Sequence, residues 1–233
     1  MMERSGIAQI LLRRWLPLYL LAFLLLSCET DSYDAGEGPY SLLQADFAEV
    51  TADQQRKASS FLTDDGLSYA FSEPYSATWM TTADSTYRVT IYYNKVDEQT
   101  AKALSVVNMP TIIPRDTSYI KRTTQDPLGV ESCWLTRNGK YINMGLLLMN
   151  GRNEQGEESV HTLAVLVDSV QTYADQTTTA YYRLLHDQGQ APAYYTNRRY
   201  VSILLPAVDR PDTVCLSVRT YNGEVTKAFK LDK

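Results

Sequence analysis

The sequence predicts an all-β protein in which an N-terminal OB-like barrel is followed by a C-terminal antiparallel β-sandwich. Two observations support this fold class. Apolar and polar residues alternate with a period of two over many short segments, as in half-buried strands. Turn-forming Gly, Asn, Asp and Pro residues separate these segments. Strongly helical stretches are scarce, so we expect the chain to fold mainly from strands.

Residues 40–112 are expected to form the barrel, because about five strands fit into this length. A first strand is predicted at 40–51. The Asp65-Gly66 pair between two apolar arms predicts a tight hairpin with positive φ angles at both residues. Residues 86–93 alternate cleanly, and 103–109 form the last predicted strand, although 97–104 also allows a short helix. The alternation between 86 and 93 places four residues on one face: Tyr87, Val89, Ile91 and Tyr93.

Two prolines, Pro110 and Pro114, predict a domain boundary. Residues 118–233 are expected to form the sandwich, because short strands recur there with turn signals about every 8 to 12 residues. The predicted strands are 131–136, 140–149, 159–168, 178–186, 199–205, 213–220 and 225–231.

The first 27 residues have the pattern of a bacterial lipoprotein signal peptide. Basic residues precede an uncharged apolar run from Trp15 to Ser27, about 13 residues long. A membrane-spanning helix needs about 20, and Pro17 interrupts this run, so a permanent anchor is disfavoured. Leu25-Leu-Ser-Cys28 resembles a lipobox, which predicts that Cys28 is acylated and becomes the first mature residue. Two or three acyl chains, palmitate among them, would anchor the protein durably.

Residues 28–39 are acidic and rich in glycine, and we expect them to form a flexible tether. No Asp follows Cys28 directly, so the usual signal for retention at the inner membrane is missing. The sequence therefore predicts a protein lipid-anchored to the outer membrane, on its periplasmic or its surface-exposed face.

The charge of the mature chain disfavours nucleic acid as a partner. Loss of Arg4, Arg13, Arg14 and Glu3 with the signal peptide reduces the 22 basic and 27 acidic residues to 19 and 26, a net charge of −7. Binding to phosphates requires clustered Lys and Arg.

No catalytic, metal or cofactor site is predicted. The two histidines, His161 and His186, each share a strand face with apolar residues, so we expect buried neutral imidazoles bonded to the main chain. The sequence has no His-x-His, Cys-x-x-Cys or Gly-x-Ser-x-Gly pattern and no glycine-rich phosphate loop. We therefore expect a protein that is not an enzyme.

Five segments of the C-terminal half occur in a characteristic order: 126–134 (DPLGVESCW), 139–145 (GKYINMG), 161–163 (HTL), 182–187 (YRLLHD) and 201–205 (VSILL). The N-terminal half adds the lipobox, the Asp-Asp-Gly hairpin and an Arg-Val-x-Ile-x-Tyr strand at 88–93. This succession resembles the NigD-like proteins, which are named after a bacteriocin gene cluster. The resemblance implies an OB-like barrel and a β-sandwich in an envelope lipoprotein of anaerobic bacteria with two membranes. The chain departs from the family pattern at Ile203, where an aromatic residue is expected.

A binding function is the favoured interpretation, with an envelope glycan, a peptide or a protein as the partner. OB-like barrels commonly bind oligosaccharides and peptides on a strand face and its loops. Tyrosines on a sheet surface also form cross-strand pairs, which is the alternative role for the aromatic residues. The candidate ligand-binding residues are Trp79, Tyr92, Tyr194, Tyr195, Arg198 and Arg199.

The alternative function is a structural or accessory subunit of a surface pilus. In lipoprotein-secreted pilins, a protease removes the first strand after a basic residue, which opens a groove for a neighbour's strand. The first basic residue after Cys28 is Arg56, just beyond the first predicted strand.

Cys133 and Cys215 are the remaining thiols of the mature chain. An oxidising compartment favours a disulfide between them. Their strand positions argue against it, since Cys215 shares a face with Ser217 and Arg219, whereas Cys133 shares one with Leu135. We predict two free thiols, with Cys133 buried and Cys215 facing solvent.

Overall fold

The computed structural model describes residues 40–121, 123–152, 156, 160–190 and 192–231. The predicted signal peptide, Cys28 and the tether at 28–39 lie outside these residues. From Leu43 onward the chain forms one compact unit. In the described part there are thirteen strands and no helix, so no helical membrane span is found there. The all-β prediction is confirmed.

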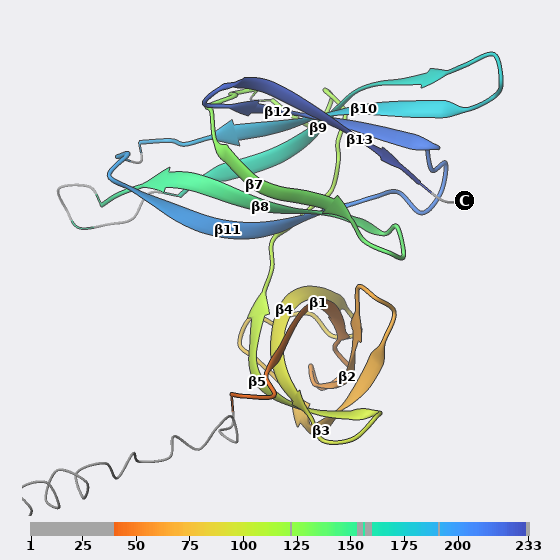
Figure 1. The fold of residues 1–233 in the computed structure, drawn as a ribbon, viewed down its shortest axis with the longest axis vertical. Coiled ribbons are helices and arrows are strands. Elements are labelled where there is room, and N and C mark those ends of the chain that lie inside the picture. Colours follow the sequence, from red (N-terminus) through yellow and green to blue (C-terminus); the bar gives the residue numbers. More distant parts are fainter. Residues whose placement is uncertain (1–39, 122, 153–155, 157–159, 191, 232–233) are drawn as a thin grey trace, which may run out of the picture. The chain divides into compact units, whose positions relative to one another are not determined.

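Five strands form a closed barrel in the order β1-β2-β3-β5-β4, with β4 pairing back to β1 (Figure 1). All neighbours are antiparallel except β3 and β5, which run parallel. This is the OB-like barrel that the sequence predicts. Its strands are β1 (Gln44–Thr51), β2 (Ala58–Thr63), β3 (Ser68–Tyr75), β4 (Thr86–Lys95) and β5 (Thr100–Asn108).

Two local predictions in the barrel need correction. In the β2–β3 hairpin only Gly66 has a positive φ, of 83°, so Asp65 does not share the left-handed conformation. The possible helix at 97–104 is wrong, because β5 begins at Thr100. The Asp97 carboxylate accepts hydrogen bonds from the main-chain N–H groups of Gln99 and Thr100, and this forms a tight turn instead of a helix start.

The sandwich consists of two four-stranded sheets, with orders β13-β12-β10-β9 and β6-β11-β8-β7 (Figure 1). All seven predicted strands are present, and β6 was not predicted. The strands are β6 (Thr111–Ile112), β7 (Gly129–Leu135), β8 (Tyr141–Asn150), β9 (Thr162–Thr172), β10 (Thr178–Asp187), β11 (Tyr195–Leu204), β12 (Thr213–Thr220) and β13 (Gly223–Lys230).

The sequence predicts an antiparallel sandwich, but the sandwich also contains parallel strand pairs. β10 and β12 are parallel neighbours, because the chain crosses to the other sheet to form β11 before it returns. β6 and β11 are also parallel. Thr111 and Ile112, which the sequence grouped with the barrel, thus extend a sheet of the sandwich.

The two cores differ in composition. The barrel core is built around aromatic side chains, with the rings of Phe61 and Tyr93 5.0 Å apart. The sandwich core is mainly aliphatic, with Ile142, Leu146 and Ile203 fully buried. The alternation that predicted the strands therefore places its apolar face inward in both domains.

Cys133 and Cys215 are free, as predicted, and both are partly buried. The expected contrast between a buried and a solvent-facing thiol is therefore wrong. Cys133 packs at the margin of the sandwich core, whereas Cys215 lies on β12 between two neighbouring strands.

Candidate functional site

One edge of strand β11 is only partly covered. β8 lies along one side of β11 for the whole length of the strand. On the other side, β6 pairs only with Ser202 and Ile203. Within the described residues, the stretch from Tyr195 to Val201 therefore has no strand on this side.

Main-chain hydrogen bonds show which groups face the free edge. Residues two apart in an antiparallel strand direct their N–H and C=O groups to the same side. The Ser202 N–H donates to the Pro110 carbonyl at 3.0 Å, away from β8. Tyr200 and Arg198 have the same orientation, and their main-chain groups have no main-chain partner in the part of the chain that the structure describes.

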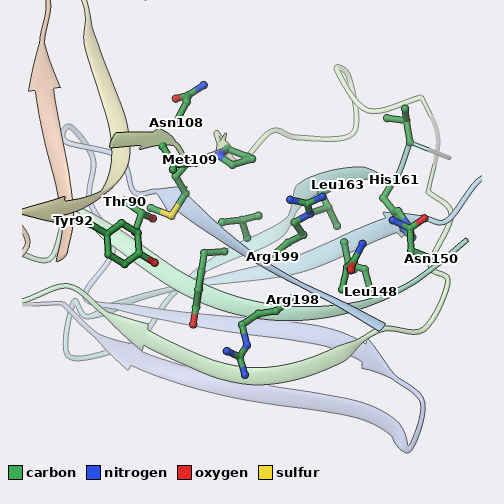
Figure 2. Close-up of a pocket in the computed structure, with 16 residues that line it drawn as sticks. Thr90, Tyr92, Asn108, Met109, Leu148, Asn150, His161, Leu163, Arg198 and Arg199 are labelled. Atoms are coloured by element: carbon green, nitrogen blue, oxygen red, sulfur yellow. The ribbon is translucent and has the colours of Figure 1, made fainter. Parts of the chain in front are cut away.

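A groove of about 520 Å³ lies beside this free edge (Figure 2). Its size is that of a typical ligand pocket. We call it the β11 groove. Its lining comes from β4 and the end of β5 with the following linker, from β8, from β9 with the two residues before it, and from β11. The described lining residues are Thr90, Tyr92, Val107, Asn108, Met109, Pro110, Leu148, Asn150, Val160, His161, Leu163, Asn197, Arg198, Arg199, Tyr200 and Val201.

The groove is rich in hydrogen-bond donors, and none of the described residues that line it carries a carboxylate. Arg198 is ion-paired with Glu131, outside the lining. Arg199 is exposed, and in the described part of the chain it has no ion-pair partner. The described lining is therefore locally cationic on a chain whose net charge is −5.

The two histidines form a hydrogen-bonded pair at one end of the groove. His186 is buried, and its Nδ1 lies 3.1 Å from the carbonyl oxygen of Asp126. A carbonyl only accepts, so His186 Nδ1 carries the proton and Nε2 is an acceptor. His161 Nδ1, 2.8 Å from that Nε2, must then donate to it. The Nε2 of neutral His161 is left with a lone pair.

The prediction of a buried imidazole bonded to the main chain is confirmed for His186. His161 is only partly buried, lines the groove and bonds to His186. Burial lowers the pKa of both imidazoles. The neighbouring His186 lowers the pKa of His161 further, and a hydrogen bond with the main chain of Met149 partly opposes the shift. The buried Nε2 of His161 has no hydrogen-bond partner among the described residues. It is an acceptor that a bound molecule can satisfy.

The structure brings three of the six candidate binding residues to the groove: Tyr92, Arg198 and Arg199. Tyr194 and Tyr195 are exposed but do not line it. The sequence suggests that Trp79 is an exposed aromatic residue, and this is wrong. Trp79 packs against the barrel core and contacts Tyr75 and Tyr87.

The sequence pattern did not predict His161 as a residue of the groove. One signal was available. The antiparallel pairing of 159–168 with 178–186 places the start of the first strand beside the end of the second, and His186 indeed pairs with Leu163. The predicted start of β11 at residue 199 was also four residues too late. The free edge was therefore not foreseen.

The other half of β11 is closed by a buried polar network. The Arg88 guanidinium donates to both Asp64 carboxylate oxygens, at 2.6 and 2.5 Å. It also donates to Ser202 Oγ and to Asn143 Oδ1, each at 3.1 Å. The Tyr141 ring lies 4.3 Å from the guanidinium carbon. The network joins β4 and the β2–β3 hairpin of the barrel to β8 and β11 of the sandwich.

Comparison with known proteins gives a likeness in structure only, since no family model and no curated protein matches the chain. A NigD-like immunity protein from Bacteroides caccae superposes with a TM-score of 0.61 and 21% identity, covering 81% of this chain and 98% of that one. A protein of unknown function from Bacteroides vulgatus has a TM-score of 0.61 and 14% identity, covering 82% and 92%.

A candidate lipoprotein from Bacteroides fragilis has a TM-score of 0.55 and 13% identity, covering 82% of this chain and 97% of that one. Identities this low establish a common fold, without a common function. At that level the resemblance read from the sequence motifs is confirmed: the chain has the fold of a NigD-like protein.

Proposed function

We propose that this chain is a noncatalytic, lipid-anchored protein of the cell envelope that binds a peptide segment of a partner protein in the β11 groove. One observation carries the proposal: a groove of about 520 Å³ lies along main-chain groups of β11 that have no partner in the described residues. The lipobox at Cys28 and the structural likeness to a candidate lipoprotein support the envelope location.

A peptide fits this groove better than a glycan does. Protein sites for sugars rely on exposed aromatic rings. Among the described residues, two rings line the groove, those of Tyr92 and Tyr200, and the Tyr200 ring already packs against Phe47. Unpaired N–H and C=O groups along a strand edge instead match the main chain of a peptide. The negative charge of the mature chain continues to disfavour nucleic acid.

The noncatalytic part of the proposal is supported by the histidine pair. A catalytic histidine usually holds a hydroxyl or thiol within hydrogen-bonding reach. His161 Nδ1 is engaged by His186, and no such group reaches His161 Nε2 in the described part of the chain.

The pilus alternative requires removal of β1 after Arg56. β1 lies between β2 and β4, and its Ala48 and Val50 are fully buried, so removal would open the barrel. Arg56 is exposed in the β1–β2 turn. Sequencing the N-terminus of the protein from its native envelope separates the two functions: acylated Cys28 supports the present proposal, and Lys57 would support the pilus subunit.

Site-specific photo-cross-linking tests the groove as a partner site. A photoreactive phenylalanine analogue replaces Tyr92 in the groove or, as a matched control, Tyr221, an exposed tyrosine in the β12–β13 turn outside it. After irradiation of intact cells, we expect a discrete protein adduct from position 92 and none from position 221. Equal adducts from both positions, or none from either, would contradict the proposal.

The lipid anchor needs its own test. We expect Cys28→Ser to abolish incorporation of an alkyne-labelled palmitate and to release the protein from the membrane fraction. A Cys215→Ser variant, which leaves the lipobox intact, is the control. Retention of the label by Cys28→Ser would exclude acylation at this residue.

A further inference from the structure

We infer that the β11 groove binds an acidic peptide in extended conformation, which adds to the free edge of β11 as a further β-strand. The inference rests on the proposed function and specifies its binding mode and the chemistry of its partner. Strand addition uses main-chain hydrogen bonds for affinity and alternate side chains for specificity.

The edge already accepts one short strand. β6 pairs in parallel with Ser202 and Ile203, and its pairing begins with the hydrogen bond from the Ser202 N–H to the Pro110 carbonyl. The chain that leads into β6 belongs to β5 and the linker, and Asn108, Met109 and Pro110 line the groove just before β6 begins. An added strand would cover the part of β11 that precedes Ser202, beyond the first residue of β6.

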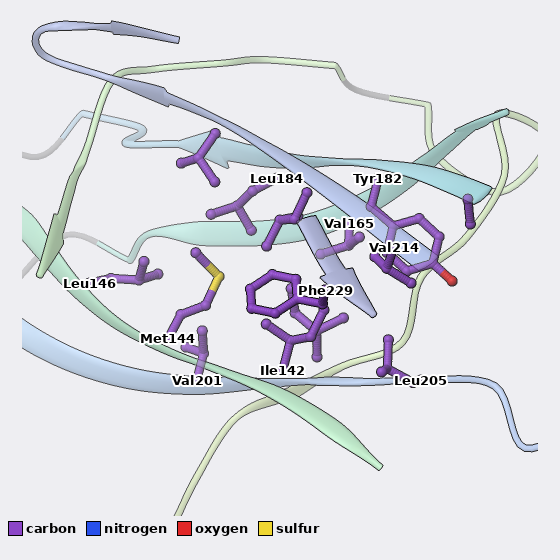
Figure 3. Packing of buried hydrophobic residues seen from close by; sticks show 14 of the residues in the cluster. Ile142, Met144, Leu146, Val165, Tyr182, Leu184, Val201, Leu205, Val214 and Phe229 are labelled. Carbon is purple, nitrogen blue, oxygen red and sulfur yellow. The ribbon is translucent and has the colours of Figure 1, made fainter. Parts of the chain in front are cut away.

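The groove offers different surroundings to alternate side chains of such a strand. Val201 of β11 points into the sandwich core (Figure 3). Tyr200 faces the opposite way, and its ring lies 5.3 Å from that of Phe47 in the barrel. Neighbouring strands in a sheet share this alternation. One set of peptide side chains would therefore lie toward His161 and Leu163, and the other toward Tyr92.

Charge selects an acidic peptide. Among the described residues, two arginines and no carboxylate line the groove, and Arg199 has no anionic partner there. A Glu or Asp side chain can form a charge-assisted hydrogen bond with its guanidinium. The lone pair on His161 Nε2 can accept a hydrogen bond from a peptide hydroxyl or amide.

Charged residues also occur on free edges merely to prevent aggregation. In that role they need no hollow beside them, whereas here a groove lined by both domains runs along the edge. The two roles differ in what they predict for a free peptide, because an edge that only repels other strands would bind none.

Fluorescence anisotropy with the chain from Glu29 to Lys233 tests the inference. The probes are labelled nine-residue peptides that alternate Val and Thr and carry two Glu residues, and the same peptides with Gln in place of Glu. We expect the Glu peptides to bind about tenfold more tightly, and Arg199→Gln to remove this preference. Equal binding of Glu and Gln peptides would overturn the acidic specificity.

Methylation of peptide nitrogens tests the strand geometry. Two series of the best peptide are methylated at alternate amides, one series at odd and one at even positions. Because a strand directs alternate N–H groups to one side, one series should lose binding at least about tenfold and the other should retain it. Equal losses in the two series would exclude strand addition.

Two variants at one position test the edge of β11 itself. Arg198→Pro removes an N–H that points to the free edge, whereas Arg198→Ala removes the same side chain and keeps the N–H. We expect only the proline variant to lose binding of an uncharged Gln peptide beyond the loss seen with alanine. Urea denaturation of both variants checks that each is folded.

The outcomes separate the two levels of the proposal. If no peptide binds and position 92 gives no adduct, the proposed function fails. If peptides bind but neither N-methylation at alternate positions nor Arg198→Pro selectively weakens their binding, the groove is a binding site and strand addition is excluded. If the chain alone forms a stable dimer that the peptides do not dissociate, the edge is occupied by a second copy, and the inference is wrong.

Discussion

The two halves of β11 differ in what covers them. Ser202, in the second half, is fully buried, paired with β6 and bonded to Arg88 and Asn143. Arg198, four residues earlier on the same face, is exposed beside an open edge. The strand alternation is the same in both halves. Segments that are distant in sequence therefore decide which half is closed and which is available for binding.

The largest loss of stability is expected when the polar network that closes the second half of β11 is disrupted. Asp64→Ala leaves the Arg88 side chain, which is 1% exposed, without its carboxylate partner. Removing one member of a buried ion pair typically destabilises a protein by about 3–5 kcal/mol. We expect a loss of that size in the free energy of unfolding, measured by urea denaturation.

Asp65→Ala is the matched control. This neighbouring carboxylate is 61% exposed and lies 3.7 Å from an exposed arginine, so we expect a change below about 0.5 kcal/mol. The double variant Arg88→Met with Asp64→Ala should recover part of the loss, because no buried charge is left unpaired. A single-variant loss below about 1 kcal/mol would show that the network does not close this half.

Smaller losses of stability allow the two halves of β11 to be compared directly. Ser202→Ala removes a buried hydroxyl that bonds to Arg88 and Asn143, and we expect a loss of about 1–3 kcal/mol. Arg198→Ala removes an exposed side chain paired with Glu131 and should change stability by less than about 1 kcal/mol. Equal losses in chemical denaturation would refute the contrast between the halves.

The histidines at the open half should make stability depend on pH. Burial lowers the pKa of His161 and His186 in the folded chain, while the unfolded chain has the ordinary value of about 6.5. Their contribution to stability is therefore complete above pH 6.5 and is lost as the pH falls toward the lower folded value, because the unfolded chain then binds protons first. Asp126 and Asp187 oppose the shift at His186, and Arg199 adds to the shift at His161.

The measurement is the free energy of unfolding at pH 7.5 and at pH 5.5 for the native chain and for His186→Asn. We expect the native chain to lose more stability over this interval than the variant does. A pH dependence that is identical in the two proteins would show that the histidine pair is not responsible.

The smallest expected effect is on the reactivity of Cys133 in β7, the strand at the opposite edge of the same sheet. Lys227 covers this edge by donating from Nζ to the Cys133 carbonyl at 2.5 Å. Burial raises the pKa of the Cys133 thiol to about 11, and Lys227 opposes this shift only in part. We therefore expect Cys133 to react slowly with iodoacetamide at pH 8 in the folded protein, since the thiolate is the nucleophile.

Mass spectrometry after labelling of the denatured, unreduced chain should count two alkylated cysteines when Cys28 is absent. The Cys215→Ser variant isolates the rate at Cys133 in the folded state. A count of zero that rises to two after reduction would establish a disulfide and contradict the free thiols. Rapid labelling of Cys133 in the folded chain would show that the β7 edge is open as well.

Most of the strands could be predicted, because alternation with a period of two reports which face of a strand is buried. The prediction was weakest at the ends of strands. β6 was missed because two residues carry no periodicity, and β11 was started at residue 199 because polar Tyr195, Asn197 and Arg199 occupy its inward-facing positions. Those polar residues break the alternation where β11 reaches the groove.

The motifs that carried the family resemblance converge in the fold. Asp64 comes from the Asp-Asp-Gly hairpin, Arg88 from the Arg-Val-x-Ile strand, Asn143 from GKYINMG and Ser202 from VSILL, and all four belong to one hydrogen-bonded network. Each motif by itself contains only common residue types. In this chain the four motifs together supply the partners that a buried guanidinium needs.

The amino-acid sequence by itself determined the predicted export signal, the all-β class and the position of most strands, because these depend on local composition and on periodicity along the chain. Only the tertiary structure decided that Arg88 is buried among partners up to 114 residues away, that His161 bonds to His186, and that no described strand covers one edge of half of β11. These features depend on which strands become neighbours. That choice results from the packing of two complete sheets and a barrel, which no short stretch of sequence contains.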